Sequence, residues 1–149
     1  MVRKGFIVYL CFAFALLVAC KKEEGSTTPS ITLIGVSKTD IIEFKDSLFI
    51  TIEYEDLDGN IGTQDPDAKS LFVQDERYEN PEAYHIPPIT PLDKVLKVKG
   101  TIRVYIPTLI RRSSGPFEKT ILSIRLKDRD GNWSNTVDTP LLTIFEPEG

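Results

Sequence analysis

Several residue types that carry chemistry or stabilise small exported proteins are scarce in this chain. It has one histidine, one tryptophan, one methionine and two cysteines among 149 residues. The histidine, His85, stands alone in a proline-rich segment, and the sequence has neither a nucleophile elbow nor a zinc-ligand cluster. The sequence therefore predicts a protein that is not an enzyme.

Long apolar runs are also missing. The longest uncharged stretch near the N-terminus, Gly5 to Ala19, has 15 residues, whereas a membrane-spanning helix needs about 20. Arg3 and Lys4 precede this stretch, and Cys20 follows it directly. A short basic segment, a short apolar segment and a small residue at the end are the layout of a signal peptide.

The residues Leu17-Val18-Ala19-Cys20 resemble the lipobox of bacterial lipoproteins. The resemblance implies that residues 1–19 are removed and that Cys20 carries acyl chains on its sulfur and on the new amino group. Two or more chains give stable attachment to a membrane, since each buried methylene adds roughly 0.8 kcal/mol. Cys11 would leave with the leader, so no disulfide is expected. An ordinary secretory leader and a transmembrane anchor are the alternatives.

Residues 20–30 are polar and small after the cysteine, which predicts a flexible tether ahead of one domain at 31–149. Position 21 is Lys, whereas in lipoproteins an Asp there commonly marks retention at the inner membrane. The resemblance therefore implies a lipid-anchored outer-membrane protein. Lys22-Glu23-Glu24 also resembles a short cell-surface signal, for which a solvated charge run is the alternative.

The mature chain is acidic. Without Arg3 and Lys4 it keeps 16 basic and 22 acidic residues, a net charge near −6. This balance argues against nucleic acid as a partner. The expected partners are the membrane, reached through Cys20, and a glycan or an envelope protein.

Beyond the tether, apolar residues alternate with polar ones almost everywhere, and no segment has a convincing helical period. We expect an all-β, antiparallel two-sheet sandwich of six or seven strands. The spacing resembles immunoglobulin-like and fibronectin type III domains over about residues 31–146, although the Cys-Trp-Cys core of true immunoglobulin domains is absent. The expected strands are 31–36, 47–55, 70–75, 95–106, 119–128 and 140–145, with a seventh either missing or hidden in 76–93.

One five-residue pattern, Asp-x-Asp-Gly-Asn, occurs twice, at residues 56–60 and 128–132, each time at the end of a predicted strand. We call these segments the first and the second acidic turn. In an immunoglobulin-type sandwich these two strands run toward the same pole, so the two turns would be neighbours. Carboxylate and amide oxygens that converge where glycine bends the backbone suit calcium, which takes six to eight oxygen ligands. Calcium is the expected cofactor, and no organic cofactor is expected. The candidate metal ligands are Asp56, Asp58, Asn60, Asp128, Asp130 and Asn132.

The first copy partly matches an EF-hand loop, with Asp67 at the position of its last carboxylate. The match fails at Ile61, where an EF-hand has glycine, and the second copy has Thr139 in place of the last acid. Sandwich domains with calcium between loops, as in cadherin-like families, are the nearer resemblance. The alternative is a pair of structural turns, because Asp-Gly and Gly-Asn favour turns. In such polar turns we expect carboxyl groups with ordinary pKa values.

Aromatic residues offer a second candidate site. Tyr78 and Tyr84 lie in the long, proline-rich 76–92 connection, and Trp133 follows the second acidic turn. Exposed rings held by prolines could stack on a sugar. Alternatively, the tyrosines cover a sheet edge and Trp133 covers the end of the core.

Three hypotheses for function follow. The first is a non-enzymatic binding or adhesion module of the cell envelope, stabilised by calcium. The second is a glycan-capturing accessory lipoprotein, resembling those of starch-uptake systems, which usually contain several such domains. The third is a scaffold subunit that binds another envelope protein without needing sugar or calcium.

Overall fold

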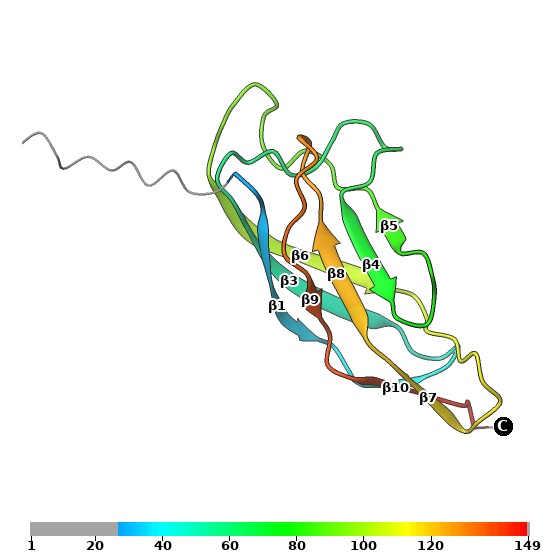
Figure 1. The fold of residues 1–149 in the computed structure, drawn as a ribbon. Coiled ribbons are helices and arrows are strands. Elements are labelled where there is room, and N and C mark those ends of the chain that lie inside the picture. The colour runs from blue at the N-terminus through cyan, green and yellow to red at the C-terminus, as the bar shows by residue number, and fades with distance from the viewer. Residues whose placement is uncertain (1–26, 149) are drawn as a thin grey trace, which may run out of the picture.

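The computed structural model describes residues 27–148, so Cys20 and the leader lie outside the described residues. This part of the chain has no helix long and apolar enough to cross a membrane. It contains ten strands, drawn in Figure 1: β1 (Ser30–Val36), β2 (Asp40–Ile42), β3 (Leu48–Asp56), β4 (Leu71–Asp75), β5 (Glu82–Tyr84), β6 (Val98–Ile106), β7 (Phe117–Thr120), β8 (Leu122–Leu126), β9 (Val137–Asp138) and β10 (Leu142–Phe145).

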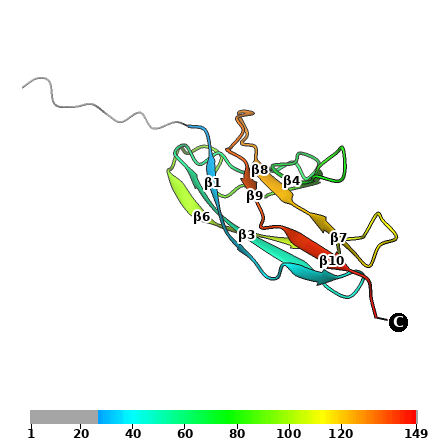
Figure 2. The ribbon, with the colours of Figure 1, turned by 60° about the horizontal axis from the view of Figure 1, so that its bottom comes forward.

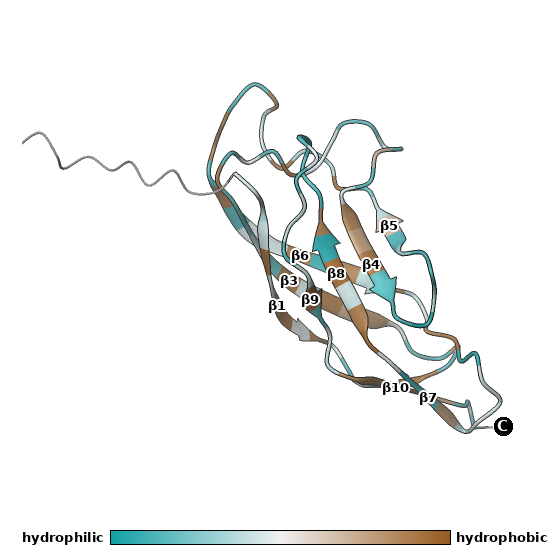
Figure 3. Ribbon diagram, in the orientation of Figure 1, coloured by the Kyte–Doolittle hydropathy of each residue, from teal (hydrophilic) through white to brown (hydrophobic). Residues whose placement is uncertain are grey.

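One layer of the protein is the antiparallel sheet β1-β3-β6. Along β3, every second residue is buried, so the strand presents one face to the core and the other to solvent. Figure 3 shows hydrophobic residues, coloured brown, on the strands that supply the core. A single cluster of buried side chains, running from Ile31 to Ile144, joins this sheet to the opposite layer.

The opposite layer consists of two hydrogen-bonded sheets, β5-β4-β8-β9 and β2-β10-β7. β7 and β8 are separated only by Ile121, and Figure 2 shows β7 and β10 continuing the line of β8 and β9. The break falls opposite Pro140, which has no backbone N–H to donate. Thr139 bridges it, since its Oγ1 accepts a hydrogen bond from the backbone of Leu122 at 3.0 Å. The result is one kinked hairpin that contributes to both sheets.

The all-β sandwich prediction is confirmed, but its details need correction. The predicted strand 119–128 is two strands, and β6 begins at Val98 rather than at residue 95. β5 lies within 76–93, where a seventh strand could be hidden, but the short strands β2 and β9 were not expected, and the total within the described residues is ten instead of six or seven. The pairing is also not wholly antiparallel, because β10 runs parallel to β2.

Candidate functional site

The two acidic turns meet at one pole of the sandwich. The side-chain amide of Asn60 donates to Oδ2 of Asp130 at 2.9 Å, and the backbone N–H of Arg129 donates to the carbonyl of Asn60 at 3.2 Å. Ile61 and Asp128 also form an isolated antiparallel bridge. The predicted juxtaposition of the turns is therefore confirmed.

The first aspartate of each turn points inward because it continues the buried face of its strand. In β3 the buried row runs through Ile52 and Tyr54 to Asp56, and after β8 it runs through Leu126 to Asp128. Asp56 is 1% exposed and Asp128 is 6% exposed. The period-two alternation of the sequence thus places a carboxylate at the end of each hydrophobic row.

Three buried oxygens of the first turn have no hydrogen-bond partner: Oδ1 of Asp56, Oδ1 of Asp58 and Oδ1 of Asn60. The orientation of the Asn60 amide follows from its neighbours, because its nitrogen donates to the carboxylates of Asp58, at 3.2 Å, and Asp130. Reversing the amide would place its oxygen against two carboxylates. Buried oxygens without donors are rare in folded proteins and call for a specific partner.

The electrostatics of the first turn differ from those expected of a polar turn. Burial, the neighbouring Asp58 and, more weakly, Asp128 together raise the pKa of Asp56 to about 6, with burial the largest cause. The expectation of ordinary pKa values is therefore wrong for Asp56. A carboxylate taken out of water beside another carboxylate is stabilised by a proton or by a cation.

The second turn is satisfied by its own residues. Oδ1 of Asp128 accepts the backbone N–H of Asn132 at 2.7 Å, and Oδ2 accepts the side-chain amide of Asn132 at 2.9 Å. In the first turn, Oδ2 of Asp56 accepts the matching backbone N–H from Asn60, but the amide of Asn60 points elsewhere. The two copies thus share a backbone geometry but differ in the oxygens left without a donor.

Across residues 27–148, no three histidine, cysteine, aspartate or glutamate side chains form a group that could hold a metal ion. A cation at the first turn would rely instead on the carboxylates of Asp56 and Asp58, the amide oxygen of Asn60, and water or backbone oxygens. Such mixed oxygen sets suit calcium, which accepts carbonyl and water ligands beside carboxylates.

The three aromatic candidates do not converge. Trp133 lies 4.8 Å from Phe72, between ring centroids, and the guanidinium of Arg125 lies 4.5 Å from the Trp133 ring. Tyr84 is half-buried against the core, and its hydroxyl donates to Glu82 at 2.6 Å. Tyr78 follows the other end of β4 and is 47% exposed.

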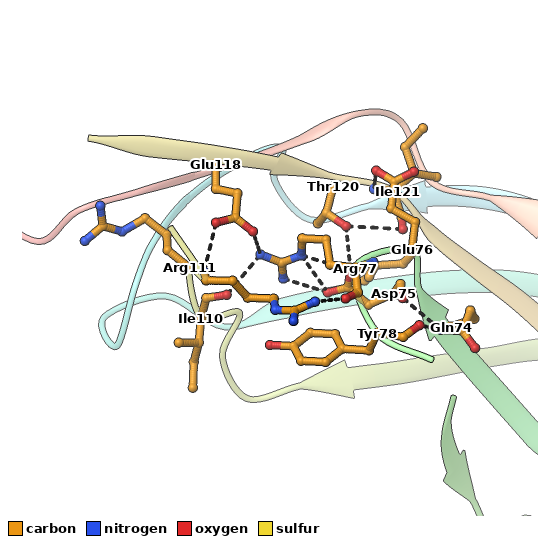
Figure 4. Close-up of polar contacts among 12 residues, drawn as sticks. Gln74, Asp75, Glu76, Arg77, Tyr78, Ile110, Arg111, Glu118, Thr120 and Ile121 are labelled. Atoms are coloured by element: carbon orange, nitrogen blue, oxygen red, sulfur yellow. Dashed lines mark hydrogen bonds and ion pairs between the residues drawn. The ribbon is translucent and has the colours of Figure 1, made fainter. Parts of the chain in front are cut away.

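A charged cluster that the sequence analysis did not identify lies beside Tyr78 (Figure 4). The guanidinium of Arg77 joins the carboxylates of Asp75, at 2.6 Å, and Glu118, at 2.7 Å. Hydrogen bonds from Arg77 and from the backbones of Arg112 and Ser113 lower the pKa of Glu118 to about 2. Asp75 and Arg77 are two residues apart, but Glu118 is 41 residues away, so local pattern alone could not group them.

Next to this cluster is a cleft of about 330 Å³ between the layers. Its apolar lining comes from core residues such as Val73 and Leu122, and its polar lining includes Asn80 and Glu82. Tyr78 also lines it. The cleft is large enough for a small ring-shaped ligand.

No protein-family model matches the chain, and comparisons with curated proteins and with solved structures find no match either. The geometry of the described residues is therefore the basis for a function.

Proposed function

We propose that this chain is a non-enzymatic lipoprotein of the cell envelope, attached through Cys20 to the outer membrane. Its immunoglobulin-like sandwich is a binding or adhesion module that calcium stabilises at the first acidic turn. The observation that carries this proposal is the set of unpartnered oxygens on Asp56, Asp58 and Asn60. Asp56 and Asn60 are each more than nine-tenths buried, so bulk water is a poor substitute for a ligand.

Calcium stabilises both unfavourable features of the first turn, the two neighbouring carboxylates and the amide oxygen that lacks a donor. It offers a positive charge to the two neighbouring carboxylates, and it accepts electron pairs from the amide oxygen that lacks a donor. The second turn needs no such ligand, because Asn132 already satisfies Asp128. The proposal therefore assigns the cation to the first copy, with Asp130 and the second turn holding Asn60 in place.

Thermal unfolding with calcium or with a chelator tests this function. A fragment of residues 21–149 is suitable, because it contains every described residue and the whole buried core. If the dissociation constant lies near those of extracellular calcium modules, about 10 mM calcium stabilises the fold by roughly 1–3 kcal/mol. Magnesium at equal concentration is the control, since its smaller coordination sphere suits this site less well. An unchanged midpoint with calcium would contradict the proposal.

The lipid anchor has its own test. Full-length protein expressed in a bacterium should partition into the detergent phase, and a Cys20→Ser variant should stay in the aqueous phase. Partition of the unaltered protein into the aqueous phase would remove the anchor but leave the calcium site standing.

Glycan capture is the second candidate function, and the cleft beside Tyr78 favours it. An exposed ring at the rim with an amide and carboxylates alongside suits a sugar, which needs a flat apolar face and hydrogen-bond acceptors. Calorimetric titration with a panel of oligosaccharides should then show binding that Tyr78→Ala removes. Trp133→Ala is the matched control, because Trp133 lies near the other end of β4 and does not line the cleft.

A further inference from the structure

The loop from residue 91 to residue 97, just before β6, exposes an unusual set of side chains. All seven residues are exposed, and three are large and apolar: Leu92 at 48%, Val95 at 79% and Leu96 at 45%. Lys94 and Lys97 lie among them, with Asp93 as the one acid of the loop. Exposed apolar side chains gathered in one short segment mark a contact surface more often than scattered ones do.

Hydrogen bonds hold this loop in place, so its apolar side chains are presented outward by a fixed backbone. The N–H of Leu96 donates to the carbonyl of Asp58 at 3.2 Å, and Oγ1 of Thr90 donates to the carbonyl of Gly59 at 2.6 Å. Within the loop, the N–H of Lys94 donates to the carbonyl of Pro91 at 3.3 Å. The loop is therefore fastened to the first acidic turn.

The loop lies at the pole where the described chain begins. In the sheet register, Ser30 pairs with Glu55, and Glu55 pairs with Lys99. The first residue of β1 is thus two strand spacings from the start of β6, roughly 10 Å. Figure 1 shows the connection before β6 and the start of β1 at the same end of the molecule.

This placement brings the loop within reach of the membrane that the proposed anchor enters. Ser30 lies ten residues after Cys20 in the sequence, and a chain of that length reaches at most about 36 Å. An anchor at Cys20 keeps this pole within that reach of the membrane, whereas the opposite pole can lie further away by about the 30 Å length of β3. We propose that residues 91–97 contact the phospholipid bilayer, with Leu92, Val95 and Leu96 entering its interface.

The charges agree with this assignment. Lys94 has no acidic partner within residues 27–148, whereas Lys97 pairs with Glu55 at 2.6 Å on the exposed surface. Lysine beside apolar residues is the combination found where proteins lie against phospholipid headgroups, because the stem sits among apolar groups and the ammonium reaches phosphate. The proposal rests on the attachment at Cys20 proposed above, which keeps this pole close to the membrane.

A site-directed fluorescent label tests the contact, because residues 21–149 contain no cysteine. Val95→Cys and, as the matched control at the opposite pole, exposed Phe117→Cys would each carry a polarity-sensitive dye. An N-terminal hexahistidine tag in place of residues 1–20 would attach either protein to phosphatidylcholine–phosphatidylglycerol vesicles that contain a nickel-chelating lipid. The dye at position 95 should shift to shorter wavelength and the dye at position 117 should not.

A second variant addresses the strength of the contact. Leu92→Asp with Val95→Asp should weaken sedimentation of the untagged fragment with the same vesicles by roughly tenfold or more, while Phe117→Asp leaves it unchanged. Equal dye responses at positions 95 and 117, or no response at either, would overturn the proposal. A dye response at position 95 that appears without lipid as the protein is concentrated would show that the loop contacts a second copy of the protein, and it would also overturn the proposal. The calcium-dependent midpoint of the same fragments reports on the proposed function separately.

Discussion

The side-chain amide of Asn60 donates a hydrogen bond of 2.9 Å to the carboxylate of Asp130, across 70 residues of sequence. This contact joins the two acidic turns and determines which way the Asn60 amide faces. Because the nitrogen is used by Asp130 and Asp58, the oxygen is left among the unpartnered carboxylate oxygens of its own turn. One hydrogen bond between the copies thus completes the candidate cation site in one of them.

Replacing Asp58 by Asn should separate a cation site from a structural turn. The loss of one negative charge beside Asp56 should stabilise the metal-free protein by about 1 kcal/mol, because two neighbouring carboxylates repel. The same change should abolish the stabilisation by calcium. Urea unfolding with calcium and with a chelator measures both effects.

Asp128→Asn is the matched control for this substitution. Asp128 is the first aspartate of the second turn, where both carboxylate oxygens already accept hydrogen bonds from Asn132. Its replacement should lower stability by about 1–2 kcal/mol through a lost acceptor, yet leave the calcium response in place. A calcium response that survives Asp58→Asn and disappears in Asp128→Asn would place the cation at the second turn and contradict the proposal.

Much of this site could be predicted from the periodicity of the sequence, but part of it could not. The repeated Asp-x-Asp-Gly-Asn pattern and the expected strand directions correctly predicted that the turns meet. The burial of Asp56 could also be predicted, because Asp56 extends the buried alternation of Ile52 and Tyr54. Its acidic side chain instead favoured the expectation of a solvated turn. The hydrogen bond from Asn60 to Asp130 depends on loop geometry that no local pattern specifies.

The fold, like the site, could be predicted from the sequence only in part. β3 could be predicted almost to the residue, since nine alternating positions leave only one register with an apolar core. β2 and β9 have three and two residues, too few for a period to be visible. The parallel pairing of β2 with β10 joins segments about 100 residues apart, and only packing of the whole chain brings them together.

Gly59→Ala should disturb the first turn and the loop fastened to it. Gly59 has a φ of 69°, and a Cβ there would lie 2.2 Å from the carbonyl oxygen of Leu96. The substitution should therefore destabilise the protein by about 2–4 kcal/mol and release residues 91–97. Amide hydrogen exchange would detect faster exchange at Leu96, whose N–H bonds to Asp58. Gly35→Ala is the control, since nothing lies within 4 Å of its added carbon and little change in stability is expected.

Phe44→Asn should stabilise the protein. Among the described residues, Phe44 is the single non-glycine residue with positive φ, at 62°, and its ring is 69% exposed. A bulky side chain is strained in this region, whereas asparagine tolerates it, so the change should add about 0.5–1 kcal/mol. Phe117→Asn is the control, because its exposed ring is held on an extended strand and offers no such gain. A stability for Phe44→Asn equal to or below that of the unaltered protein would contradict the strain.

Glu118 should set the acid stability of the pole opposite the acidic turns. Its carboxylate accepts hydrogen bonds from Arg77 at 2.7 Å and from the backbones of Arg112 and Ser113 at 2.8 Å each, which lowers its pKa to about 2. A carboxyl group whose pKa is lower in the folded state stabilises the fold above its unfolded pKa. That stabilisation is lost as pH falls through the folded value.

Glu118→Gln provides the test, because glutamine keeps the shape of the side chain but does not titrate. At pH 7 the variant should be less stable by about 2 kcal/mol, since Arg77 then faces Asp75 alone and one acceptor oxygen is replaced by a donor. Between pH 4.5 and about pH 2 the difference between the two proteins should shrink, because only the unaltered protein gains a proton at this position. Urea unfolding at a series of pH values gives both curves. A difference that stays constant down to pH 2 would mean that Glu118 supports the fold by its shape and not by its charge.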